Sequence, residues 1–234
     1  MDPGNGAILA EAEWPYRHGI LSALPDGTAV PEGYVLQDPS DFREALYEVV
    51  KALLGSSGAK GAAVAAIGLD STASTVVPVT EDLTPLCSLA PFRNHPGAYA
   101  VMWKDHRAAA EAAMLTEALR RTDAAWLDRF GGSIGAEALV SKAAHIALDM
   151  PGIYGAAYAF MEMGDWLTSL LTGRPALSRT MTAAAVTCCT RLDTSRPMNS
   201  RRKAFGQKYH FVGLPMPSMF QPDSAARIPP RYTW

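Results

Sequence analysis

Residues 64–87 read VAAIGLDSTASTVVPVTEDLTPLC and, after a short loop, residues 94–107 read NHPGAYAVMWKDHR. The first apolar run, VAAI, leads into GLD and a row of small hydroxylated residues, and a second apolar run, VVPV, follows. A short apolar run bounded by Gly and small polar residues is typical of a buried strand. Ligands of open α/β sheets bind beyond the carboxyl ends of the strands. The stretch therefore predicts a strand over 63–69 that ends in a ligand-binding turn.

The segments before this stretch predict a strand and a helix. Residues 7–18 alternate well enough to form a strand, and a turn-rich loop follows. A helix is expected to begin near Asp38 and to end at Gly55. Either Asp38, with Pro39 at the first helical position, or Ser40 can supply the cap. A strand, a helix and a strand in this order predict a parallel crossover in an α/β sheet.

The segments after this stretch predict a hairpin and three helices. The hairpin runs through 80–82, and an Ala-rich helix covers 105–127. Two more helices are expected over 134–149 and 153–171, interrupted by Met-Pro-Gly and closed by Thr-Gly. The glycine-rich turn before the first of these has Ser133 as a possible cap and lacks the spacing of a nucleotide-binding loop.

Composition limits the class of protein. The chain has 234 residues, of which 48% are hydrophobic and 19% are charged, as in soluble globular proteins. No apolar run approaches the roughly 20 residues that span a bilayer, and the N-terminus lacks the features of a secretory signal. The three cysteines have neither a disulfide pattern nor a metal-ligand spacing. We therefore expect a cytoplasmic protein with no membrane partner.

Charge is distributed unevenly along the chain. Residues 174–234 contain ten Lys or Arg and only two Asp, although the whole chain has a net charge of −2. Such asymmetry can mark a nucleic-acid-binding tail, but the segment shows no sustained periodicity and is rich in Pro. We interpret 174–234 as an irregular basic tail and expect no nucleic-acid partner.

The stretch at 64–107 resembles the FGGY sugar-kinase family, and within it the ribulokinases. The family pattern there is a strand ending G-[VL]-D-x-T-[AS]-[CS]-T, a hairpin through D-x-x-x-P-L-C, and a later W-K-x-H. Four further segments resemble family motifs in the same order: WPYRHG at 14–19, LQDPSDF at 36–42, RFGGSIGAEALVSKA at 129–143 and FMEMGDWLTSLLTG at 160–173.

This resemblance implies a fold and an activity. The expected fold is an α/β, incomplete actin-like (ribonuclease H-like) ATPase domain, with several helices and a sheet that lacks its first strands. Residues 1–173 would be the sugar-side, N-terminal domain, and 174–234 would lie outside the family pattern. The complete family member transfers the γ-phosphoryl group of MgATP to a ribulose-type pentulose.

The resemblance also implies substrate-binding residues. Asp70, Thr72 and Ala73 lie in the turn that would contact the sugar, with the Ala73 backbone touching the pentulose, and Trp103 and Lys104 would lie near the same pocket. From the residues alone, the favoured interpretation of Asp70 is a carboxylate that satisfies amides of its own turn. The segment at 103–107 could likewise be a helix N-terminus where an Asp favours the helix dipole.

Other parts of the family machinery have no counterpart in the sequence. The G-x-D-x-G-T phosphate turn, the catalytic Asp of the second domain and the substrate-contacting Lys after T-G are not found, and an altered reading frame would explain the divergent tail. We therefore assign no catalytic, cofactor-binding or metal-binding residue and expect little kinase activity from this chain. The alternative is a non-catalytic sugar-binding or interaction remnant. His18 and His106 could act as a base, but neither has a nucleophile or carboxylate partner at a recognised spacing. His95 and His145 are expected to be structural.

Overall fold

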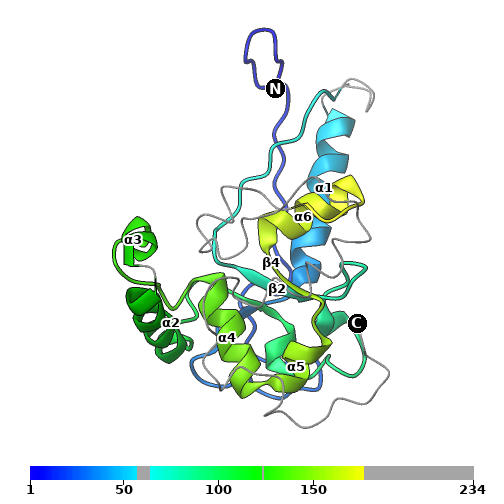
Figure 1. Ribbon diagram of the computed structural model, residues 1–234. Helices are drawn as coiled ribbons and strands as arrows, with labels where there is room; N and C mark the ends of the chain where they lie inside the picture. Colours follow the sequence, from blue (N-terminus) through cyan, green and yellow to red (C-terminus); the bar gives the residue numbers. More distant parts are fainter. Residues whose placement is uncertain (57–63, 123, 177–234) are drawn as a thin grey trace.

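The computed structural model describes residues 1–56, 64–122 and 124–176 (Figure 1). The predicted tail, apart from its first three residues, lies outside the described part. Helices and strands are found in the following order: β1 (Leu36–Gln37), α1 (Pro39–Ser56), β2 (Val76–Val79), η2 (Leu86–Ser88), η3 (Pro96–Ala98), β3 (Ala100–Val101), α2 (Ala109–Thr122), α3 (Ala124–Leu127), η4 (Asp128–Phe130), α4 (Leu139–Asp149), α5 (Pro151–Ala156), β4 (Ala159–Glu162) and α6 (Met163–Thr172).

Four strands form one sheet in the order β1-β3-β2-β4, and every pair is antiparallel. The predicted parallel crossover is therefore wrong. Residues 64–69, the described part of the predicted strand at 63–69, do not form a strand, so they cannot pair with β2. The neighbours of β2 come instead from later in the chain, since Val76 pairs with Val101 in β3 and with Glu162 in β4.

Strand β2 is buried on both faces. Val76 belongs to a core cluster with Val101 and Phe160, whereas Val77 and Val79 belong to a second cluster. Helices α4 and α5 cover the first face and α1 and α6 cover the second, which gives three layers (Figure 1). A strand covered on both faces needs apolar side chains at successive positions, which explains the run VVPV.

Pro78 is compatible with this central position because of the side to which its nitrogen points. The carbonyls of Thr75 and Val79 accept hydrogen bonds from the β4 side, at 2.9 and 2.8 Å. Residue 78 therefore faces the other edge of β2, where β3 reaches only as far as Val76. The missing N–H of proline leaves no partner unsatisfied there.

The predicted helix at the start of the chain is confirmed as α1. Asp38 supplies the cap, because its Oδ1 accepts a hydrogen bond from the Ser40 amide at 2.8 Å, and Pro39 is the first helical residue. The predicted hairpin after β2 is also confirmed. The Thr80 amide donates to the Thr84 carbonyl at 2.9 Å, and Val79 bridges to Pro85.

Several predicted boundaries are wrong. Residues 7–18 do not form a strand, because no other strand pairs with them in the described part of the chain. The single helix predicted over 153–171 is two helices separated by β4, since pairing with β2 holds the intervening residues extended. The helix predicted over 134–149 begins only at Leu139, with Ala138 rather than Ser133 at its cap position.

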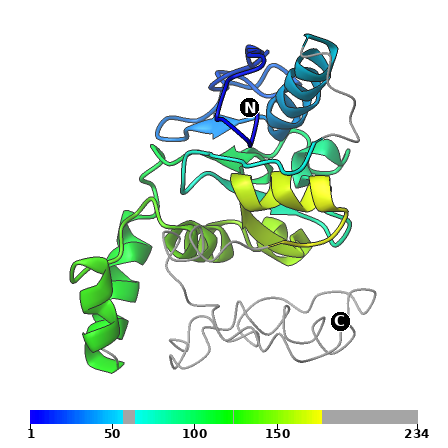
Figure 2. The same ribbon diagram turned by 90° about the horizontal axis from the view of Figure 1, so that it is seen from above.

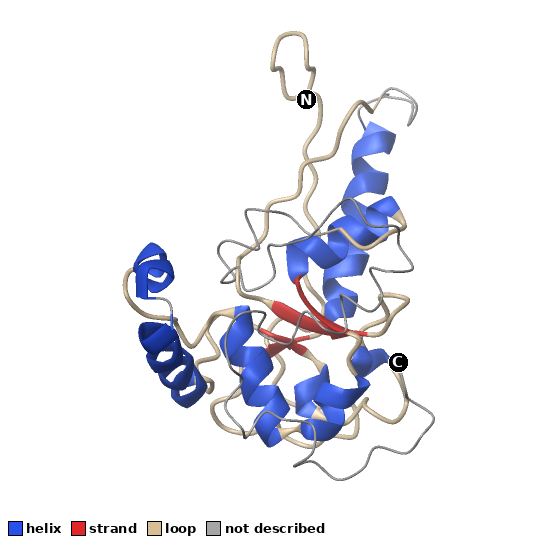
Figure 3. Ribbon diagram, viewed as in Figure 1, coloured by secondary structure: helices blue, strands red, loops and turns tan. Residues whose placement is uncertain are grey.

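Helices α2 and α3 project away from these layers, as the secondary-structure colouring and the view from above both show (Figures 2 and 3). They correspond to the helix predicted over 105–127, which in fact begins at Ala109. A third apolar cluster, including Leu115, Leu119 and Ala144, joins α2 to α4. No helix in the described ranges combines the length and apolar character needed to cross a membrane.

Candidate functional site

The two segments that contain the predicted sugar-binding residues meet at one end of the sheet. Residues 70–75 lead into β2, and residues 102–107 follow β3. Because Val76 at the start of β2 pairs with Val101 at the end of the antiparallel β3, both segments emerge at the same end. We call the first segment the entry turn and the second the exit loop. The end of β4 reaches the same place, where Glu162 pairs with Val76.

The predicted residues within these segments are accessible. Asp70 and Thr72 are exposed, and Ala73 is half-buried. The Trp103 side chain is also exposed, and the Lys104 Nζ lies 5.4 Å from the centre of its ring. An exposed indole beside polar side chains can stack against a sugar while the polar groups bind its hydroxyls. Their role in binding sugar stays a prediction.

Two buried charges lie beneath these accessible residues. The Lys142 Nζ of α4 donates hydrogen bonds to the carbonyls of Ser74, at 2.5 Å, and of Met102, at 2.8 Å. A third bond reaches the Val101 carbonyl at 3.3 Å. Oε2 of Glu162 accepts a bond from the Ser74 amide at 2.8 Å. Lys142 and Glu162 are each only 2% exposed. Two buried charged side chains therefore hold the backbone of the entry turn, and Lys142 also holds that of the exit loop.

Burial shifts the protonation equilibria of both groups. Desolvation lowers the pKa of Lys142 to about 8, although nearby Asp105 and Glu162 favour its charged form. Desolvation also raises the pKa of Glu162 to about 7, opposed by its hydrogen bond from Ser74 and by the charge of Lys142. Near neutral pH both groups are therefore close to the point at which they change charge.

The exit loop contains a second anchored charge, Asp105. Its side chain accepts a hydrogen bond from the Val35 amide at 2.9 Å and pairs with Arg107, whose Nη2 lies 2.9 Å from Oδ2. The Arg107 guanidinium in turn stacks on the Tyr34 ring at 3.3 Å. The alternative expectation, that Asp105 favours a helix dipole, is wrong because α2 begins only at Ala109.

Among the described residues, His18 and His145 have carboxylate partners that no recognised sequence spacing indicated. His18 Nδ1 lies 2.8 Å from the buried Asp41, which also accepts bonds from the amides of His18 and Gly19. This contact joins the WPYRHG segment to the start of α1. The contact therefore favours a structural role for His18.

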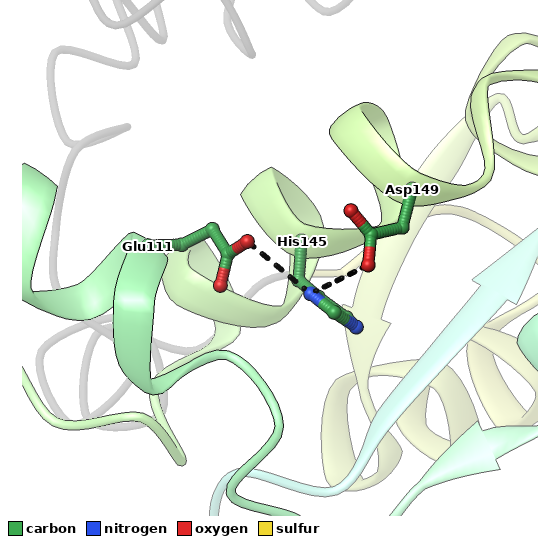
Figure 4. Close-up of side chains that lie close together, drawn as sticks. All are labelled: Glu111, His145 and Asp149. Atoms are coloured by element: carbon green, nitrogen blue, oxygen red, sulfur yellow. Dashed lines mark hydrogen bonds and ion pairs between the residues drawn. The ribbon is translucent and has the colours of Figure 1, made fainter.

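His145 lies between Glu111 and Asp149 (Figure 4). Its Nδ1 is 3.3 Å from Oε1 of Glu111 and 3.6 Å from Oδ2 of Asp149. The opposite ring nitrogen faces Arg107 Nη1 at 3.5 Å. A metal-ligating histidine normally donates its other N–H to an acceptor, and a guanidinium can only donate. The arrangement therefore suits a proton on Nδ1 better than a metal ion.

Sequence reasoning missed Lys142 and Glu162 as parts of the candidate site. Both occur in segments that resemble family motifs, RFGGSIGAEALVSKA and FMEMGDWLTSLLTG. The sequence did contain a signal for them, because each is a charged residue inside a mostly apolar helix or strand. Such a residue is rarely buried without a partner, so its presence indicates a specific polar contact.

Comparisons with known proteins find relatives that match most of this chain. No family model matches the chain. Ribulokinase from Halalkalibacterium halodurans is 35% identical over 176 residues, which cover 74% of this chain and 31% of that protein. Ribulokinase from Mycolicibacterium smegmatis is 37% identical over 173 residues, covering 73% of this chain and 31% of the relative. The chain therefore spans less than a third of the length of these curated relatives.

A solved structure supports the fold assignment. Gluconate kinase from Lactobacillus acidophilus superposes with a TM-score of 0.51 at 16% identity, over 75% of this chain and 32% of that one. The expected fold class, part of an actin-like ATPase fold, is confirmed, with the correction that the sheet of the described residues is small and antiparallel.

Proposed function

Because this chain belongs to the FGGY sugar kinases, with ribulokinases among its relatives, we propose that it forms the sugar-binding part of a kinase for a ribulose-type pentulose. The observation that carries the proposal is the meeting of the entry turn and the exit loop at one end of the sheet. We propose that the Ala73 backbone and the Trp103 ring contact the sugar at this end of the sheet. Asp70, Thr72 and Lys104 supply hydrogen-bonding groups around it.

The complete kinase would use MgATP as the phosphoryl donor. Phosphoryl transfer depends on a phosphate cradle and on carboxylates that hold the magnesium ion. The described residues do not fit MgATP. Lys142 already donates to three backbone carbonyls, so its ammonium group is not available to a phosphate. The cluster of Glu111, His145 and Asp149 contains a histidine nitrogen that faces Arg107, whereas Mg²⁺ prefers oxygen ligands and water. We therefore propose that this chain alone binds sugar without transferring phosphate.

We also propose a cytoplasmic location, which fits the ATP use of the complete kinase and a buried, free Cys87.

Two measurements on the full chain test this function. Calorimetry with ribulose should show binding, and a coupled ADP-release assay with ribulose and MgATP should show no turnover. Xylulose, which differs from ribulose in the configuration at one carbon, is the matched control ligand and should bind less tightly. Turnover at an ordinary kinase rate of roughly 1–100 s⁻¹ would contradict the second half of the proposal.

Matched variants locate the binding. Trp103→Ala should abolish ribulose binding, whereas Trp14→Ala, which removes an indole of similar exposure in the N-terminal segment, should leave it unchanged. If both variants bind ribulose like the parent chain, the sugar does not lie at the exit loop. If the parent chain itself binds no ribulose, the alternative of an interaction remnant is favoured.

A further inference from the structure

Ser74, at the base of the entry turn, has an unusual backbone conformation. Its φ of +66° lies in the left-handed region, which among the described non-glycine residues only Ser74 and Leu83 occupy. Such a conformation is costly for a residue with a side chain and persists only where the surroundings enforce it. Ser74 is also buried, so solvent cannot satisfy its backbone groups.

Two opposite charges enforce this conformation. The Ser74 amide donates to the Glu162 carboxylate, and its carbonyl accepts from the Lys142 ammonium group. Hydrogen bonds to ionised groups are among the strongest in proteins. Each polar backbone group of one residue is thus bound by a buried charge from a different element, β4 on one side and α4 on the other.

The same lysine also binds the backbone of the exit loop. Lys142 donates to the carbonyl of Met102, the residue immediately before Trp103. Glu162, by binding the Ser74 amide, fixes the peptide plane that joins Ala73 to Ser74, and Lys142, by binding the Ser74 carbonyl, fixes the next plane, which joins Ser74 to Thr75. One pair of side chains therefore determines the relative positions of the Ala73 backbone and the Trp103 ring.

We propose that Lys142 and Glu162 are positioning residues for the sugar: by binding both backbone groups of Ser74 and the carbonyl of Met102, they hold the entry turn and the exit loop in one relative geometry. This inference rests on the proposed function, because it assigns a purpose to the geometry of that same site. Neither residue needs to touch the sugar.

Changes in protonation should weaken these hydrogen bonds above about pH 8, where Lys142 loses its charge, and below about pH 7, where Glu162 loses its charge. Above about pH 8 Lys142 loses one of the three protons that it donates, and below about pH 7 Glu162 becomes a neutral acceptor. Ribulose has no group that titrates in this range, so its affinity should be highest between these values. The charged groups that act on the pair are Asp105, Glu137, Arg107 and Asp165.

The affinity of the full chain for ribulose between pH 6 and 9 tests this inference. In the parent chain, affinity should fall on both the acidic and the alkaline side. Lys142→Met should raise the Kd by about tenfold or more at pH 7.5 and remove the alkaline limb. Glu162→Gln, which keeps the size and an acceptor oxygen, should remove the acidic limb. Lys51→Met, which removes an exposed lysine of α1, is the matched control and should change neither.

A rescue experiment separates positioning from simple stabilisation. Glycine adopts a positive φ at little cost, so Ser74→Gly in the Lys142→Met background should restore the urea midpoint but not the ribulose affinity. Rescue of both would overturn the inference, as would unchanged affinity and an unchanged pH profile in Lys142→Met and Glu162→Gln. Absence of ribulose binding by the parent chain at every pH would instead overturn the proposed function itself, and the sugar role of the pair with it.

Discussion

Two apolar runs of four residues, VAAI at 64–67 and VVPV at 76–79, have very different positions in the structure. Val76, Val77 and Val79 are fully buried, whereas Val64 is 46% and Ile67 54% exposed. The second run is paired with β3 and β4, and the first is not part of a strand. Local hydrophobicity therefore does not decide which run becomes a strand. The presence of partners from distant parts of the chain decides it.

The largest expected effect comes from placing a charge in each run. Val77→Asp buries a carboxylate between α6 and the sheet with no partner, and we expect the variant not to fold. Ile67→Asp is the matched change in the first run, and we expect the free energy of unfolding to change by less than about 0.5 kcal/mol. Circular dichroism and urea unfolding measure both. Equal destabilisation by the two variants would show that 64–67 is packed in solution.

A smaller effect is expected from the charge at the end of β4, next to the second run. The pKa of Glu162 in the folded chain, about 7, lies above its ordinary value of 4.5, so the folded state takes up a proton that the unfolded state does not. This contribution to stability is fully present below pH 4.5 and is lost as the pH rises through 7, by roughly 3 kcal/mol.

Glu162→Gln should remove that pH dependence. The measurement is the difference in urea unfolding free energy between the parent chain and the variant from pH 4.5 to 8. Glu117→Gln, an exposed carboxylate of α2, is the control and should leave the slope in place. A slope that persists in Glu162→Gln would show that another group is responsible.

The smallest effect is expected in the N-terminal segment, where exposure resembles that of the first run. Arg17 Nη2 lies 3.0 Å from Oε1 of Glu44, and the Arg17 side chain is 67% exposed. Exposed ion pairs contribute about 0–1 kcal/mol, so Glu44→Gln should lower the unfolding free energy by less than about 1 kcal/mol. A larger loss, measured at low and high salt, would mean that this pair fixes the segment to α1.

The same contrast explains how far sequence reasoning reached. Helix α1 was predicted because its cap and its periodicity are local signals, and the hairpin after β2 was predicted because its turn at 80–82 is local as well. The strand at 7–18 was predicted wrongly because alternation says nothing about a partner. Strand β4 was missed for the converse reason, because its extended form comes from pairing with β2.

The candidate site shows a similar division. The entry turn and the exit loop were predicted from motifs, and the structure brings them together. Their support was not predicted, because Lys142 is 68 positions and Glu162 is 88 positions from Ser74 in the sequence. Contacts at such separations depend on the tertiary fold and leave no local pattern.

The pairing of β2 with β4 also has a consequence for synthesis of the chain. Val79 pairs with Ala159, which is 80 positions later. At a translation rate of about 5–20 residues per second, that edge of β2 waits roughly 4–16 s for its partner. During this interval a ribosome-bound nascent chain presents an apolar, unpaired strand edge, which is the kind of surface that chaperones bind.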